Sequence, residues 1–249
     1  MIITDDRFKE RPHGNTIIWR YMSIDKFLDL LISSQLFFSN LTKVSDKYEG
    51  TVYDKNFESE VRNLNNSKNN GFDEIDLEHE RKRVELLKNY TLINCWTMKR
   101  HESYALWKIY GANQSSIAIK STVSNLKDSI NNSSQDFDEK IFISKVKYQQ
   151  KLDDSFSRID ATITKKQFYD FESELRMIIF NFPVSEGGYN VPYDITSGRK
   201  INVNLDKLIN EIYLSPFLRK TYHENIKLVI SKFNSSLRNK IRESEILDN

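Results

Sequence analysis

The chain has few of the residues that form disulfides or bind structural metal ions. It contains one cysteine, Cys95, which excludes an intramolecular disulfide. It also has only four histidines, and they are scattered without the spacing of zinc ligands. These histidines are His13, His79, His101 and His223. We therefore expect neither a disulfide framework nor a structural metal.

Long apolar runs and a strong net charge are missing as well. No apolar run approaches the roughly 18 to 20 residues of a membrane span. The first residues, MIITDDRFKERPHGN, lack the basic-then-apolar order of a signal peptide. We expect a cytoplasmic protein with no membrane partner. The 37 basic and 35 acidic side chains give a formal charge of only +2, so a polyanionic partner would need a local basic patch.

Three common catalytic motifs are absent too. The sequence contains no GxxxxGK[ST], no GxGxxG and no GxSxG. Their absence removes the usual evidence for a P-loop, a dinucleotide-binding Rossmann unit and a hydrolase nucleophile elbow. Any site must therefore come from side chains that are far apart in the sequence.

What the sequence does contain is a succession of short strands and helices. With 249 residues, 39% of them hydrophobic, the chain can bury one sizeable core. Alternating or β-branched runs predict strands at residues 16–21, 36–40, 90–96, 115–121, 141–148, 175–180, 200–204 and 210–214. Apolar spacing predicts helices at residues 24–32, 103–111, 160–169 and 219–239. We predict one α+β domain over residues 1–249, with a mixed, mostly antiparallel core sheet flanked by helices and a polar helical insertion at about 54–89.

Two residues at strand ends are candidates for binding. Arg20 ends an apolar strand, where it either pairs with a structural acid or offers a planar, permanently charged fork to a phosphate or carboxylate. Ser39 ends the next strand, where serine is also a common turn former. Asp46 and Glu49 follow in the polar segment SDKYEG, and they either cap a helix or line a site, with metal binding as a further option.

The segment FESELRMIIF places two carboxylates at the entrance of an apolar strand. Residues two apart on a strand share a face, so Glu172 and Glu174 are expected to point the same way. Such a pair needs a cation or a substrate hydroxyl nearby, and Arg176 on the same face supplies an alternative, purely structural partner. Four other residues, Cys95, Trp96, Trp107 and Tyr110, are expected in core packing.

Four blocks of the sequence resemble, in order, a bacterial family known only as the domain of unknown function numbered 2971. The blocks are WRYMSIDKFLDLLISSQLFFSNLTKVSDKYEG, NCWT with SYALWKIYG, FESELRMIIF, and LINEIYLSPF. The resemblance covers most of the chain outside residues 54–89 and the polar stretch near residue 131. It implies no particular activity.

A second resemblance is to the arginine-serine-glutamate ADP-ribosyltransferases. It rests on Arg20 in a first strand, Ser39 in a second strand after an intervening helix, and the Glu-x-Glu before a late strand. The resemblance implies an ADP-ribosyltransferase-like fold with NAD as the substrate. It assigns Arg20 to the NAD phosphates and ribose, and Ser39 to bracing the glutamates and the nicotinamide ribose. Glu174 would bind the ribose hydroxyl while the nicotinamide bond breaks, and Glu172 would assist the acceptor nucleophile.

Three functions follow as hypotheses. The first is an NAD-dependent ADP-ribosyltransferase or NAD glycohydrolase, a bacterial toxin or antiviral defence effector acting on an unknown macromolecular acceptor, protein or nucleic acid. In it, Asp46 and Glu49 would join Arg20 and Ser39 around the ligand, with their loop closing over it. The second is a module that binds a nucleotide or a partner without turnover. The third is a phosphodiesterase that holds magnesium through Asp46, Glu49, Glu172 and Glu174.

Overall fold

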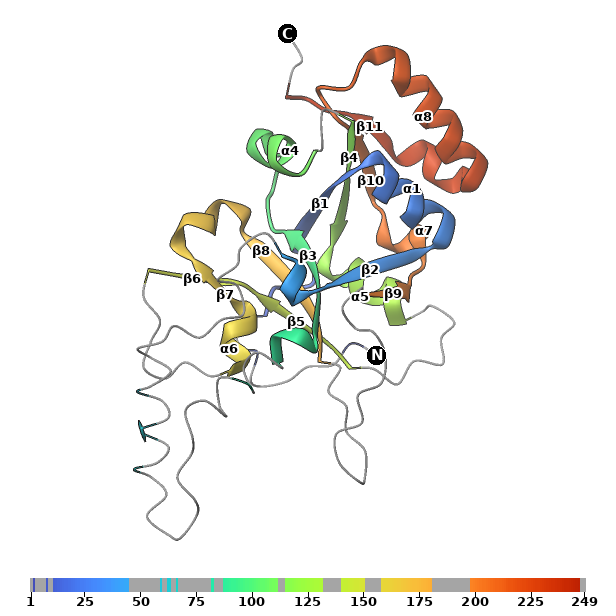
Figure 1. Cartoon of the computed structure of the whole chain (residues 1–249). Helices are drawn as coiled ribbons and strands as arrows, with labels where there is room; N and C mark the ends of the chain where they lie inside the picture. Colours follow the sequence, from blue (N-terminus) through green and yellow to red (C-terminus); the bar gives the residue numbers. More distant parts are fainter. Residues whose placement is uncertain are drawn as a thin grey trace.

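The computed structural model describes residues 2, 8, 11–44, 59, 62–63, 66, 82, 87–111, 115–131, 140–150, 158–180 and 198–246. Asp46, Glu49 and most of the predicted insertion at 54–89 lie outside these residues. The described part is mixed α and β, with an open, mostly antiparallel sheet flanked by helices (Figure 1). In these ranges no helix has the length and apolar character needed to cross a membrane.

Most of the described strands belong to one sheet. The strands are β1 (Ile17–Ser23), β2 (Gln35–Asn40), β3 (Thr91–Thr97), β4 (Ser116–Thr122), β5 (Ile141–Lys145), β6 (Lys147–Gln149), β7 (Thr164–Lys166), β8 (Glu174–Phe180), β9 (Arg199–Asn202), β10 (Glu211–Leu214) and β11 (Ile241–Glu243). The main sheet runs β11, β10, β4, β1, β3, β2, β9, and β8 pairs with both β3 and β5. Strands β6 and β7 form a separate parallel pair.

The helices cover the flanks of this sheet. They are α1 (Ile24–Ser33), α4 (Tyr104–Tyr110), α5 (Val123–Asn131), α6 (Arg158–Ile163), α7 (Leu205–Leu208) and α8 (Lys220–Phe233), with short 3-10 turns η1 (Leu41–Lys43), η2 (Gln167–Glu172) and η4 (Ser235–Lys240). Helix α1 buries Phe27, Leu30 and Leu31, which recur at helical spacing on one face. It ends where Ser34 takes a left-handed conformation with φ 52°, which turns the chain directly into β2.

The central strand β3 is paired unequally on its two edges. Along one edge, all seven residues from Thr91 to Thr97 pair with β8. On the other edge, β1 meets β3 only at Trp19 and Thr97, and β2 meets it only through Ser39 and Asn40. Because β1 and β2 hold opposite ends of one β3 edge, the sheet is open beside the middle of β3.

Two predicted elements break where the tertiary structure requires it. The strand predicted at 141–148 stops at Lys145 and resumes at Lys147 as β6, and between them the backbone N–H of Val146 donates to the carbonyl of Glu174. The helix predicted at 160–169 is wrong beyond Ile163. Its second half instead forms β7, which pairs with β6, and then η2.

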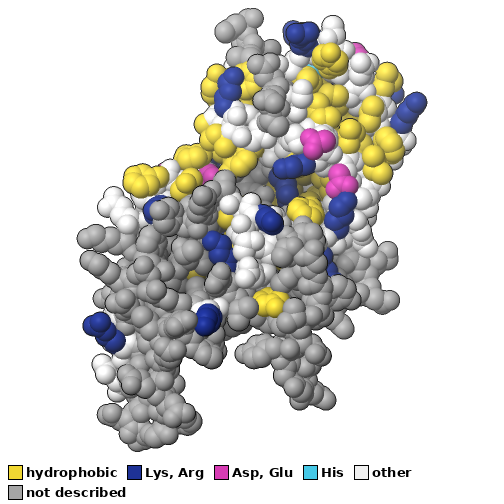
Figure 2. All heavy atoms as spheres, viewed as in Figure 1, with side chains coloured by type: hydrophobic (Ala, Val, Ile, Leu, Met, Phe, Trp, Pro, Cys, Tyr) yellow, Lys and Arg dark blue, Asp and Glu magenta, His cyan; other side chains and the backbone are white. Residues whose placement is uncertain are grey.

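The C-terminal part also differs from the prediction. The helix predicted to reach residue 239 ends at Phe233, and the Asn234 side chain accepts the backbone N–H of Ser236 to start η4. The chain then forms β11, which the sequence did not predict and which pairs in parallel with β10. Figure 2 shows hydrophobic side chains gathered at the upper right, over α1 and α8.

Candidate functional site

The open part of the sheet contains a cavity of about 790 Å³. It is lined by β1, α1, β2 and β3, and at one end by side chains of α4, β7, η2 and β8. Arg20, Ser39, Glu172 and Glu174 all line this cavity, although up to 154 positions separate them in the sequence (174 minus 20). The remaining two predicted binding residues, Asp46 and Glu49, lie outside the described residues.

Arg20 and Glu174 reach the cavity from opposite sides of the sheet. Arg20 shares a face of β1 with Ile18 and Met22, which belong to the largest apolar cluster. Glu174 pairs with Thr97, which pairs with Trp19, and Trp19 lies on the opposite face of β1 from Arg20. Both can line one cavity because β1 and β3 separate after their single contact. The gap between β1 and β3, which we call the split in the sheet, therefore brings residues from both faces of the sheet into one site.

Arg20 is a half-buried cation without a carboxylate partner among the described residues. Its Nη1 atom is inaccessible to solvent and makes no hydrogen bond. Its guanidinium lies 5.9 Å from the centre of the Trp96 ring. Burial lowers the pKa of Arg20 to about 10, because the surroundings disfavour the charged form. A guanidinium in such surroundings, without a carboxylate partner in the described residues, is a candidate for binding an anionic ligand.

Ser39 shares the cavity but does not contact either glutamate. Its hydroxyl donates only to the carbonyl of Asn40, at 3.4 Å. Ser39 therefore does not make the direct contact with the glutamates that the resemblance implies. The neighbouring Asn40 has the structural role here, because its side-chain oxygen accepts the N–H of Thr42 and caps η1.

Glu174 forms the ion pair that the sequence offered as a structural alternative. Its Oε1 accepts Arg176 Nε at 2.8 Å, and its Oε2 accepts Arg176 Nη2 at 3.0 Å. Arg176 is fully buried, and its Nη1 donates to the carbonyl of Thr162 at 2.5 Å. Burial opposes the charge of Glu174, yet Arg176 and Lys165 outweigh it and lower the pKa of Glu174 to about 2.

Glu172 does not belong to the strand, which corrects the shared-face prediction. It ends η2, and Ser173 follows in a left-handed conformation with φ 45° before β8 begins. The two carboxylates nevertheless converge, because Lys165 Nζ lies 2.7 Å from Glu172 Oε2 and 2.8 Å from Glu174 Oε2. The hydroxyl of Tyr110 donates to Glu172 Oε1 at 2.6 Å, and burial together with this carboxylate raises the pKa of Tyr110.

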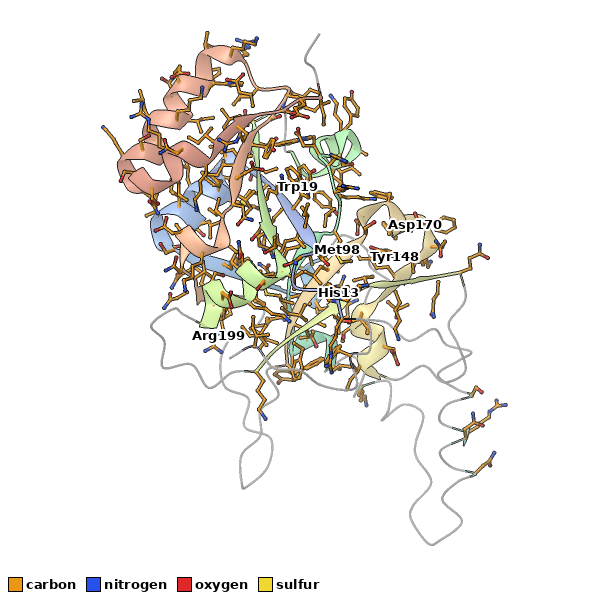
Figure 3. The ribbon with its side chains drawn as sticks, turned by 180° about the vertical axis from the view of Figure 1, so that it is seen from behind. His13, Trp19, Met98, Tyr148, Asp170 and Arg199 are labelled. Atoms are coloured by element: carbon orange, nitrogen blue, oxygen red, sulfur yellow. The ribbon has the colours of Figure 1, made fainter. Side chains whose placement is uncertain are left out.

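Backbone contacts hold the turn between the two glutamates. The N–H of Met98 donates to the carbonyl of Ser173 at 2.8 Å, and the N–H of Ser173 donates to the carbonyl of Asp170. The N–H of Glu174 donates to the hydroxyl of Tyr148 at 2.8 Å. Figure 3 shows Met98, Tyr148 and Asp170 close to one another at this turn.

Sequence reasoning missed two side chains of this cluster. Lys165 falls in the predicted helix at 160–169, where nothing distinguishes it from a solvent-exposed lysine. Tyr110 was expected in the core, but 42% of its surface is exposed and its hydroxyl binds Glu172. Trp96 and Trp107 are buried as predicted, whereas Cys95 is half-buried and lines the cavity.

A metal centre finds no support in the described part of the chain. No group of three or more His, Cys, Asp or Glu side chains in these residues is arranged to hold a metal ion. Comparison with known proteins also leaves the two resemblances as predictions: no family model matches the chain, and neither a curated protein nor a solved structure matches it.

Proposed function

We propose that this protein binds NAD in the cavity at the split of the sheet and breaks the bond between nicotinamide and ribose. The observation that carries the proposal is the shared cavity itself. Arg20 is half-buried and has no carboxylate partner among the described residues, and it lines the same space of about 790 Å³ as two carboxylates that Lys165 joins. This volume lies in the range of pockets that enclose a ligand of drug size or larger.

Arg20 is the anchor for the ligand's phosphates. A guanidinium offers two parallel N–H donors that match phosphate oxygens; Arg20 lines the cavity, and its Nη1 makes no hydrogen bond to the described residues. Binding an anion there would relieve the unfavourable burial of the positive charge. The gain would be largest where water is excluded, and the buried Trp96 ring beside Arg20 provides such a surface.

The carboxylates that line the cavity suit the bond-breaking step. When the nicotinamide leaves with the bonding electron pair, positive charge develops on the ribose ring. A nearby carboxylate stabilises that charge in the transition state more than in the substrate, which lowers the barrier. Water or a hydroxyl or other nucleophile of an acceptor then forms the new bond to the ribose carbon and releases a proton. Hydrolysis and ADP-ribosyl transfer differ only in this last partner.

The test is a binding and turnover measurement on the purified full chain. Isothermal titration with NAD should give a measurable affinity, and nicotinamide release should be detected by chromatography. Arg20→Ala should weaken NAD binding by about 10- to 100-fold, the effect expected when a hydrogen-bonded charge pair is removed. Arg242→Ala is the matched control, because Arg242 is an exposed arginine on β11 that does not line the cavity. Absence of NAD binding by the wild-type protein would refute the proposal.

A nucleotide-binding module without turnover is the second candidate. It is favoured by the way Glu174 is engaged, since Arg176 and Lys165 together already neutralise it. NAD binding that depends on Arg20, without nicotinamide release in the presence of cell-extract acceptors, would support this module over the enzyme.

A further inference from the structure

One ammonium group joins the two carboxylates of the cavity. Lys165 Nζ lies within 2.8 Å of an oxygen of each, and the side chains of Lys165 and Glu172 are each 9% exposed. Two buried carboxylates this close together repel each other unless a cation lies between them. Lys165 supplies that cation, because its ammonium contacts both carboxylates.

The two carboxylates differ in how much hydrogen-bonding capacity remains. A carboxylate has about four acceptor positions. Glu174 receives two donors from Arg176, one from Lys165 and one from the thiol of Cys95. Its positions are therefore filled by the protein, and its charge is matched by a fully buried guanidinium.

Glu172 keeps about half of its hydrogen-bond acceptor positions open. Its partners are the Tyr110 hydroxyl on Oε1 and the Lys165 ammonium on Oε2. Of these two partners only Lys165 carries a charge, whereas Glu174 also has Arg176. Glu172 is therefore the carboxylate that can accept a further hydrogen bond, and it is also the one whose charge depends on Lys165.

We propose that Lys165 is a positioning residue that balances the charge of Glu172 and leaves its carboxylate open toward the ligand, and that Glu174 supports the pair without contacting the ligand. The identity of the ligand group, a ribose hydroxyl and the positive charge next to it, rests on the proposed function. The Lys165–Glu172 coupling itself does not. The proposal exchanges the roles that the transferase resemblance implies for Glu172 and Glu174.

The first experiment tests the coupling without any ligand. Lys165→Met keeps the length of the side chain and removes its charge, so Glu172 is left as a buried anion held only by a tyrosine. Thermal unfolding of the full chain at pH 8 should then shift down by about 10 °C. The double variant Lys165→Met/Glu172→Gln should recover at least half of this loss, because it removes the uncompensated charge.

A control variant separates this coupling from the loss of a lysine elsewhere in the β6–β7 pair. Lys147→Met breaks a half-buried ion pair with Asp160 and should lower the unfolding temperature far less than Lys165→Met. Additive losses in the double variant would overturn the coupling.

The second experiment asks which carboxylate is open. Labelling with a water-soluble carbodiimide and glycine ethyl ester, followed by mass spectrometry, should modify Glu172 several-fold faster than Glu174. Glu224, whose side chain is 75% exposed, serves as the fast reference. Faster labelling of Glu174 would overturn the assignment whether or not the protein acts on NAD.

The third experiment applies if the wild-type protein releases nicotinamide from NAD. Glu172→Gln should reduce kcat by about 10²- to 10³-fold with little change in NAD affinity, since the lost interaction belongs to the transition state. Glu174→Gln should lower thermal stability but keep kcat within about tenfold, measured below its unfolding temperature. The reverse pattern would overturn the proposal. A wild-type protein inactive on NAD would refute the proposed function alone, and the first two experiments would still decide the roles of Lys165 and Glu172.

Discussion

Arg20→Met should make the unliganded protein more stable. Burial lowers the pKa of Arg20 from its ordinary value to about 10, which corresponds to a penalty on the order of 3 kcal/mol against the charged form. The contact with the Trp96 ring returns about 0.5 to 1 kcal/mol. Because part of the Arg20 side chain remains accessible, the net gain for methionine, which fills similar space, should be about 1 to 2 kcal/mol.

Arg176→Met is the matched substitution and should have the opposite sign. Arg176 makes two hydrogen bonds to Glu174 and one to the carbonyl of Thr162, and it is completely buried. Its removal leaves a buried carboxylate short of a partner, which typically costs about 3 to 5 kcal/mol. Comparing the two arginine-to-methionine variants should therefore distinguish an arginine that binds a ligand, Arg20, from one that stabilises the fold, Arg176.

Urea unfolding at pH 7.5, followed by circular dichroism without added nucleotide, measures both variants. A gain of about 1 to 2 kcal/mol raises the unfolding temperature of a chain of this size by roughly 2 to 8 °C, which a thermal scan resolves. The reasoning fails if Arg20→Met loses more than about 1 kcal/mol. Arg20 would then have a structural partner of its own, and the case for an anionic ligand would lose its main support.

Three further predictions concern the supports of the site. Burial opposes the charge of Glu174, but Arg176 and Lys165 lower its pKa to about 2. This carboxylate therefore stabilises the fold above about pH 4.5, and its contribution is lost as the pH falls toward 2. In urea titrations at a series of pH values, Glu174→Gln should weaken this acid-induced loss of stability. Gly198→Ala should cost about 1 to 3 kcal/mol, because φ is +90° and the added Cβ would lie 2.4 Å from a β2 carbonyl oxygen, whereas Gly14→Ala, with its nearest contact at 3.6 Å, should change the unfolding temperature little. Ser103→Ala should cost about 1 kcal/mol, because its side chain accepts the N–H of Leu106 at the start of α4, and unchanged thermal unfolding would contradict that role.

Local sequence patterns predicted most of the sheet. The alternating or apolar runs at 16–21, 36–40, 90–96, 115–121 and 175–180 correspond to β1, β2, β3, β4 and β8, and the helical spacing after Ser23 corresponds to α1. These predictions succeeded because the apolar residues that define each pattern in the sequence are the residues that are buried in the structure. The predictions failed at residues 164–172 and 234–243, where short segments take their structure from a partner strand or a turn.

The sequence by itself determined which residue types were available for a site: a strand-borne Arg20, Ser39, and two glutamates beside an apolar strand. Only the tertiary structure decided how they are used. The cavity exists because β1 and β3 share a single pair, Trp19 with Thr97, which are 78 positions apart in the sequence (97 minus 19). Lys165 joined the carboxylates because β7 pairs with β6 and directs its ammonium between them. Charge compensation in a buried site depends on neighbours in space, and local periodicity carries no information about those neighbours.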